Sequence, residues 1–184
     1  MSEELVVLVD HDGRDIGSAD KATVHARDTP LHRAFSCYIF NDDGLVLLTR
    51  RALSKKTWPG VWTNSLCGHP APGESNGQAI ERRMREELGA ELRDISVVLP
   101  DFAYQAVDSS GIMENEVCPV HTARLVGALR PERAEVEEWS WVHPQGLVTA
   151  LQGTPDVFSP WLQLQVPQLA AGGILGGTGG GARS

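Results

Sequence analysis

Alternating and continuous apolar runs predict most of the β-strands in this chain. Residues 34–40 and 45–51 are two apolar runs separated by the turn sequence Asn41-Asp42-Asp43-Gly44, a pattern typical of a β-hairpin. Further strands are predicted at residues 4–10, 94–99, 101–107, 112–126 and 138–144, and residues 108–111 form a turn between two of them.

Helix signals mark both ends of residues 75–90. Ser75 is a suitable N-cap with Gln78 three residues later, and Gly89 is a suitable C-terminal stop. Between these ends an apolar stripe recurs at helical spacing, formed by Ile80, Met84 and Leu88. The pattern predicts one amphipathic helix with a single buried face.

Two shorter segments, residues 143–152 and 159–166, are also predicted to be helices, because each has a proline near its first turn. Mixed short strands with a few helices predict an α+β fold, an α/β sandwich of mixed β-sheets flanked by helices. We expect a single domain over residues 1–169. Glycine dominates from residue 170 onward, so residues 170–184 are predicted to be a disordered tail.

The overall charge excludes one broad class of function. Among 184 residues, 16 are basic and 24 are acidic, and the net charge of −8 has the wrong sign for general binding to nucleic acid. Anionic small molecules remain allowed, because a local basic cluster or a bound cation can reverse the sign of one pocket.

Cysteine usage and hydropathy point to a location in the cytoplasm. The three cysteines lie far apart and cannot all pair, which favours a reducing compartment. The N-terminus is acidic where a signal peptide is basic, and no apolar run approaches the roughly 20 residues that span a bilayer. We therefore expect a cytoplasmic monomer without a membrane partner.

Acidic side chains form the first candidate site. In the predicted helix Glu87 lies beside the apolar stripe, one turn after Arg83, so the pair could hold a metal ion and an anionic oxygen; the alternative is an ordinary ion pair. Glu114 and Glu116 are two residues apart in a predicted strand and project from one face. Because adjacent carboxylates repel, they are candidates for cation binding or general-base chemistry, unless the face is simply exposed.

Histidine, cysteine and basic residues supply further candidates. With the two glutamates, His25, His32 and His69 would form a nitrogen and oxygen ligand set for a divalent ion, although spacing alone does not show that they converge. Cys67 is a structural thiol, a metal ligand or a reactive group. An anion pocket could be formed by Lys21, Arg51, Lys55, Lys56 and Arg83, each of which is otherwise a solubilising charge.

Taken together, these stretches resemble the Nudix family. The spacing of the Nudix box is matched by Gly68, Glu74, Arg82, Glu86, Glu87 and Gly89. One position differs, because Arg83 stands where the box has a glutamate. That missing carboxylate usually belongs to the metal cluster of the hydrolases.

Three longer stretches, TRRALSKKTWPGVWTNSLCGHP, YQAVDSSGIMENEVCPV and FSPW, are similar to signatures of the type 1 isopentenyl-diphosphate delta-isomerases, which share the Nudix fold. The resemblance implies a site for one divalent ion, Mn²⁺, Mg²⁺ or Zn²⁺, whose ligands are His25, His32, His69, Glu114 and Glu116. It also implies that Glu87 and the backbone carbonyl of Cys67 hold a Mg²⁺ that arrives with the substrate diphosphate.

The same resemblance implies the roles of the reacting groups. Cys67 and Glu116 match the acid–base pair, Tyr104 a partner of the glutamate, and Trp161 an aromatic wall beside the hydrocarbon. The diphosphate would be bound by Lys21, Arg51, Lys55 and Arg83.

The implied activity is the interconversion of isopentenyl and dimethylallyl diphosphate, a step of isoprenoid biosynthesis, by protonation and deprotonation through a carbocation-like intermediate. A Nudix-type diphosphate hydrolase is the alternative from another class, and Arg83 argues against it. A metal-binding module without catalysis is a third hypothesis, against which Cys67 and Glu116 argue.

Overall fold

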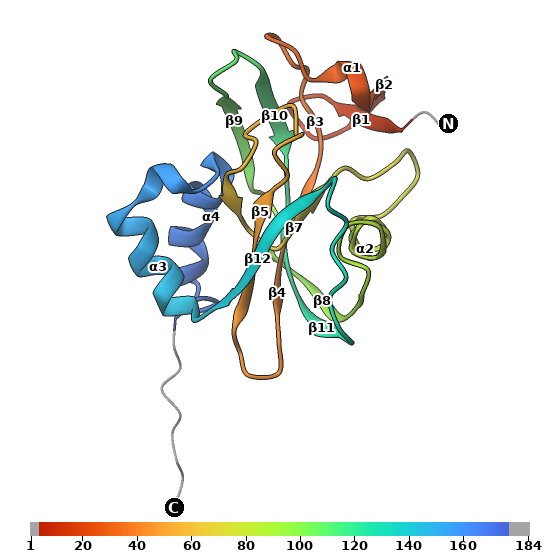
Figure 1. The fold of residues 1–184 in the computed structure, drawn as a ribbon. Helices are drawn as coiled ribbons and strands as arrows, with labels where there is room; N and C mark the ends of the chain where they lie inside the picture. Colours follow the sequence, from red (N-terminus) through yellow and green to blue (C-terminus); the bar gives the residue numbers. More distant parts are fainter. Residues whose placement is uncertain (1–3, 177–184) are drawn as a thin grey trace, which may run out of the picture.

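The computed structural model describes residues 4–176, and its core is a pair of β-sheets (Figure 1). The five-stranded sheet has the order β2-β1-β3-β10-β9, and the seven-stranded sheet has the order β12-β5-β4-β11-β8 with β6 on β5 and β7 on β4. The strands of the first sheet are β1 (Leu5–Val9), β2 (Asp15–Asp20), β3 (His32–Arg33), β9 (Ala103–Val107) and β10 (Met113–Val117). Those of the second are β4 (Phe35–Phe40), β5 (Val46–Arg51), β6 (Trp62–Thr63), β7 (Leu66–Gly68), β8 (Glu91–Leu99), β11 (Val120–Val126) and β12 (Val136–Val142).

Helices cover both faces of the larger sheet. α2 lies on one face, and α3 and α4 lie on the other (Figure 1). The helices are α1 (Lys21–Val24), α2 (Asn76–Arg83), a π-helix (Met84–Leu88), α3 (Pro144–Gly153), a 3₁₀-helix (Pro155–Val157) and α4 (Pro160–Ala171). The predicted α+β class is confirmed, as are the two helices that begin at prolines.

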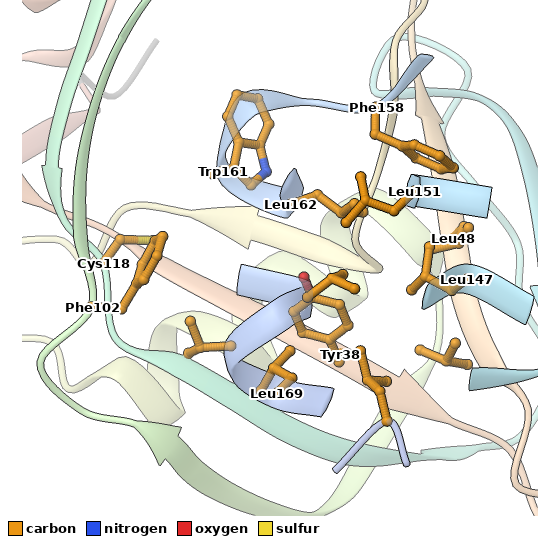
Figure 2. Close-up of a cluster of buried hydrophobic side chains, with 14 of the residues drawn as sticks. Tyr38, Leu48, Phe102, Cys118, Leu147, Leu151, Phe158, Trp161, Leu162 and Leu169 are labelled. Carbon is orange, nitrogen blue, oxygen red and sulfur yellow. The ribbon is translucent and has the colours of Figure 1, made fainter. Parts of the chain in front are cut away.

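The central strand β4 shows why its sequence is apolar at nearly every position. Phe35 and Ile39 pack against α2, whereas Tyr38 packs against α3 and α4. Figure 2 shows Tyr38 pointing into the same core as Leu147 and Leu162. Because both faces of the strand are covered, the alternation that marks a half-exposed strand is absent.

The predicted strand at residues 112–126 is wrong in one respect, because it is two strands in two sheets. β10 ends at Val117 in the smaller sheet, and β11 begins at Val120 in the larger one. Pro119 stands between them, and it has no N–H to donate to a ladder. β3 and β4 make the same passage alongside, since Ala34 N donates to Val117 O at 2.9 Å.

The helix predicted at residues 75–90 is present but not uniform. Ser75 and Gln78 form the predicted capping box, and Gly89 ends the helix in the left-handed region with a φ of 61°. From Met84 the chain continues as a π-helix, which the apolar spacing did not indicate. The structure also contains β2 and α1, which were not predicted.

The predicted tail begins too early. α4 continues to Ala171, and the chain then turns back so that Ile174 N donates to Leu169 O at 2.9 Å. Leu175 is fully buried against the α3 and α4 core. Residues 170–176 therefore return to the core, where Ala170, Ile174 and Leu175 pack, and the rest of the predicted tail lies outside the described residues.

Two further expectations concern the cysteines and membrane-spanning helices. The cysteines Cys37, Cys67 and Cys118 are all free. Within residues 4–176, no helix combines the length and apolar character needed to cross a bilayer.

Leu175 provides a test of the ordered C-terminal turn. Leu175→Ala should lower the free energy of unfolding by about 2–5 kcal/mol, because it leaves a cavity in the core. Leu164→Ala is the matched control, since Leu164 is 49% exposed on α4 and its truncation should cost less than about 0.5 kcal/mol. Urea denaturation measures both, and equal effects would contradict the packing of Leu175.

Candidate active site

Five side chains from separate parts of the chain converge on one point. Each offers a ligand atom, these atoms all lie within 4.8 Å of one another, and the residues are His25, His32, His69, Glu114 and Glu116. The histidine and glutamate set predicted from the sequence is therefore brought together. Its convergence was the one property that spacing did not establish.

Strand register explains why the cluster forms. His32 of β3 pairs with Glu116 of β10, so the imidazole and the carboxylate come from neighbouring strands. Glu114 is two residues away on the same strand and shares its face. His25 follows α1 and His69 follows β7, and both enter from loops beside the sheet.

The hydrogen bonds of the cluster suit a metal ion. His32 Nδ1 is 2.9 Å from Pro30 O. A carbonyl oxygen can only accept, so Nδ1 carries the proton of the neutral ring. The lone pair of Nε2 is then directed toward the cluster. His25 Nε2 is buried, lies 3.3 Å from Glu114 Oε2 and has no hydrogen-bond partner within the described residues. Thr57 Oγ1 donates to Glu114 Oε1 at 3.0 Å. The donor set of three imidazoles and two carboxylates fits a divalent cation.

Glu116 remains ionised although it is buried. Burial raises the pKa of its carboxyl group, but hydrogen bonds from His32 and His69 outweigh burial and hold that pKa well below its usual range. His69 Nε2 lies 2.9 Å from Glu116 Oε1. Burial lowers the pKa of His32, but the hydrogen bond with Glu116 and the charge of that carboxylate oppose burial. The pKa of His32 is raised as a result.

Cys67 lines the same cavity and lies in a polar niche. Its Sγ donates to Asn64 Oδ1 at 3.0 Å and is 3.5 Å from Ser36 Oγ. Burial raises the pKa of the Cys67 thiol to about 12, and the nearby Glu116 charge contributes in the same direction. The thiol is therefore protonated at neutral pH, while Glu116 is a carboxylate.

The cavity between these groups has a volume of about 810 Å³ and an aromatic wall. Trp161 is 3% exposed, and its ring lies 5.8 Å from Tyr104 and 5.5 Å from Trp58 between centroids. Tyr104 of β9 pairs in register with Glu116 of β10. The arrangement forms an apolar slot that reaches the carboxylate and the thiol.

Three basic residues of the cavity lining gather around shared carboxylates and form what we call the basic end: Lys21, Lys55 and Arg83. Arg83 is buried with Glu87, and its Nε donates to Glu87 Oε1 at 2.8 Å. Burial raises the pKa of Glu87, although Arg83 opposes that shift. Lys55 pairs with Glu135, and Lys21 Nζ lies 2.5 Å from Glu4 Oε2.

Arg51 connects the basic end to the aromatic wall. Its Nε and Nη2 donate to Thr57 O at 3.1 and 2.9 Å, and its guanidinium carbon lies 5.4 Å from the centre of the Trp161 ring. This geometry places a fixed positive charge beside the slot.

All the predicted site residues except His32 line this cavity, and His32 lies behind its neighbours, fully buried. Lys56 also lines the cavity, but its Nζ binds His25 O. Sequence analysis missed the supporting residues Ser36, Thr57, Asn64 and Glu135. Thr57 and Asn64 lie within the first stretch that resembles the isomerase signatures, so that stretch could have drawn attention to them. Ser36 and Glu135 act through partners that only the fold brings near.

The cluster predicts a measurable affinity for divalent ions. His25→Gln should weaken Mn²⁺ binding by at least about tenfold, because it removes one ring nitrogen. His11→Gln is the matched control, since His11 is exposed in the β1–β2 turn. Isothermal titration calorimetry measures both variants, and equal affinities would contradict the site.

The affinity should also depend on pH. The pKa of His32 is raised above 6.5, so protons compete with the ion at a higher pH than at an ordinary histidine. Mn²⁺ binding should therefore weaken as the pH falls through about 7 to 6. A constant affinity over that range would contradict ligation by these imidazoles.

Comparisons with known proteins agree with this geometry. The NUDIX domain model matches residues 30–162. A relative named isopentenyl-diphosphate Delta-isomerase from Paenarthrobacter aurescens is 59% identical over 172 residues, which is 94% of each chain. One of the same name from Corynebacterium glutamicum is 60% identical and covers 90% of this chain and 92% of its own.

Solved structures show the same fold at low identity. A protein from Deinococcus radiodurans has a TM-score of 0.69 at 19% identity and covers 90% of this chain and 98% of its own. A MutT protein from Methanosarcina mazei has a TM-score of 0.61 at 19% identity and covers 78% and 95%. The chain therefore belongs to the NUDIX domain family, in the group whose curated members are named isopentenyl-diphosphate Delta-isomerase.

Proposed function

We propose that this protein is an isomerase that interconverts isopentenyl diphosphate and dimethylallyl diphosphate. One observation carries the proposal: a protonated thiol and an ionised carboxylate, Cys67 and Glu116, line the same aromatic-walled cavity. The names of relatives that are 59–60% identical over nearly the whole chain support the same substrate pair.

The diphosphate group would bind at the basic end. Lys21, Arg51, Lys55 and Arg83 supply donors for its oxygens. In the proposed complex Glu87 and the carbonyl of Cys67 hold the Mg²⁺ that accompanies the diphosphate. Binding energy from this end would fix the five-carbon chain in the apolar slot, which lowers the entropic part of the barrier.

The chemical step moves two protons. Addition of the Cys67 proton to C4 of the substrate breaks the C3–C4 double bond and leaves a tertiary cation at C3. Glu116 then removes a proton from C2, and those electrons form the C2–C3 double bond of the product. The thiolate and the carboxylic acid return to their starting states by proton exchange, and the reverse reaction uses the same groups. Tyr104 is the proposed partner of Glu116, its neighbour in strand register.

Trp161 would protect the cationic intermediate. Water would capture a tertiary cation, whereas an aromatic face supplies electron density without a nucleophile. A desolvated contact of this kind is worth about 2 kcal/mol. The 3% exposure of Trp161 shows that its ring is shielded from solvent.

The His/Glu cluster would hold one divalent ion, Mn²⁺, Mg²⁺ or Zn²⁺. When bound, such an ion keeps Glu116 ionised and fixes its orientation. Because Glu116 is one of the five side chains of the cluster, whereas the basic residues are not, we assign the ion to the carboxylate and not to the diphosphate.

Diphosphate hydrolysis is the competing function. Arg83 contacts Glu86, Glu87 and Glu135 at the position where the Nudix box has a glutamate. A guanidinium there occupies the space that a metal-binding carboxylate would need. We further propose that the enzyme is cytoplasmic, which its free cysteines support, and that it has no nucleic-acid partner, which its net charge of −8 supports. The monomeric state remains a proposal.

Nuclear magnetic resonance of isopentenyl diphosphate, incubated with the protein and Mg²⁺ in D₂O, tests the reaction. Dimethylallyl diphosphate with incorporated deuterium is the expected product. Cys67→Ala and Glu116→Gln should each lower kcat by at least about 100-fold. Cys37→Ala is the control, because that thiol is buried in the core under α2. Free phosphate as the product would instead show hydrolysis.

Arg83 tests the anion pocket. Arg83→Gln should raise KM by about tenfold or more, since a charge-assisted hydrogen bond to the diphosphate is lost. The control is Arg85→Gln, two residues along the same helical segment and exposed to solvent. Steady-state kinetics separates KM from kcat, and an unchanged KM in Arg83→Gln would refute the anion role.

A further inference from the structure

The side chain of Asn64 joins two groups that line the cavity, the Cys67 thiol and the Trp161 indole. It is fully buried, and its Oδ1 accepts hydrogen bonds from Cys67 Sγ and from Trp161 Nε1, both at 3.0 Å. The Thr63 hydroxyl donates to the same oxygen at 3.0 Å. The thiol and the indole are therefore held by one atom, although they come from β7 and α4.

The orientation of the Asn64 amide is fixed by its partners. Its Nδ2 donates to Cys37 O at 3.2 Å and to Leu66 O at 3.0 Å, and both are carbonyl acceptors. An indole N–H can only donate, so the atom that faces Trp161 must be the oxygen. Because Cys37 and Leu66 are paired residues of β4 and β7, the amide is anchored in the central sheet.

Other contacts do not replace this one. The second polar neighbour of Cys67 is Ser36 Oγ, at the longer distance of 3.5 Å. Within residues 4–176, Asn64 Oδ1 is the acceptor found for the Trp161 indole N–H. Loss of the oxygen would leave a buried N–H without a partner and would free the thiol to rotate.

We propose that Asn64 is a positioning residue for the double-bond transfer, whose side-chain oxygen sets the spacing between the Cys67 thiol and the Trp161 ring. It acts through these two groups and does not touch the substrate. This inference rests on the proposed isomerase function. Misplacement of a reacting group by about 1 Å can cost about 100-fold in rate, so a shared anchor has a direct kinetic consequence.

Three variants test the proposal in the isomerase assay. Asn64→Leu removes the acceptor and should lower kcat by about 100-fold, while KM changes less than about threefold because the basic end is untouched. Asn64→Asp should retain more activity than Asn64→Leu, because burial favours the neutral acid, which keeps a carbonyl oxygen and one donor. Thr63→Val is the control, since it removes the third donor and a contact with the Ser159 hydroxyl but leaves the hydrogen bonds from the thiol and the indole in place.

A spectroscopic measurement tests the same contact without the reaction. In ¹H–¹⁵N spectra the indole N–H signal of Trp161, assigned among the five tryptophans with Trp161→Phe, should exchange slowly with solvent. In Asn64→Leu it should shift and exchange faster. If Asn64→Leu does not fold, the exchange rate of the wild-type indole N–H and the kcat of Asn64→Asp still test the role of Asn64.

The outcomes separate this inference from the function on which it rests. A wild-type protein that forms no dimethylallyl diphosphate refutes the isomerase proposal itself. An active wild type overturns the role of Asn64 if folded Asn64→Leu keeps its kcat, or if kcat, KM and melting temperature all deteriorate together. Rapid exchange of the wild-type indole N–H also overturns it.

Discussion

The site depends on two neighbouring chain segments that pass together from one sheet to the other. On one side of the passage His32 pairs with Glu116, and on the other Ser36 pairs with Cys67. The parallel register of β3 with β10 places the carboxylate, and the antiparallel register of β4 with β7 places the thiol. Because β3 runs directly into β4, a carboxylate of the smaller sheet and a thiol of the larger sheet come to line one cavity. Pro119 follows the end of β10 and cannot donate a backbone hydrogen bond, so the pairing of β10 with β3 stops there. The chain then enters the larger sheet at Val120. A slip of one residue would turn Glu116 away from the cavity.

Burial of charge is the cost of this arrangement, and each buried charge is compensated. Glu116 is held by two imidazoles, and Glu87 by the guanidinium of Arg83. An unpaired carboxylate at either position would neutralise by protonation, because desolvation disfavours its charged form. For Cys67, burial raises the pKa by more than its hydrogen bonds and the charge of Arg51 lower it, so Cys67 is a neutral thiol. The cavity thus contains an acid and a base in opposite protonation states at the same pH.

Sequence analysis identified the parts of the fold that depend on local chemistry. The capping box at Ser75 and the helices begun by Pro144 and Pro160 follow from contacts within a few residues, and they were predicted. The break at Pro119 was missed, because a continuous apolar run does not reveal that its halves join different sheets. Leu175 was missed for a related reason, since its burial depends on a distant core and not on its glycine-rich neighbours. Residue type and spacing supplied most of the candidate site residues, and the resemblance supplied their roles and added Tyr104 and Trp161. The role of Asn64 is visible only in three dimensions.

The loop and helix of the Nudix box explain how one scaffold can serve two chemistries. Arg82 binds Glu74 and His69 O, so the pair fixes the loop after Cys67 against α2. One position later, Arg83 replaces a carboxylate with a cation and faces the cavity. A hydrolase needs several carboxylates there to hold metal ions that activate water. With a guanidinium in that place, the same helix would, in the proposed reaction, supply charge for holding a diphosphate intact. The reacting carbons would lie beside the aromatic wall, where water, which would end the reaction, is excluded.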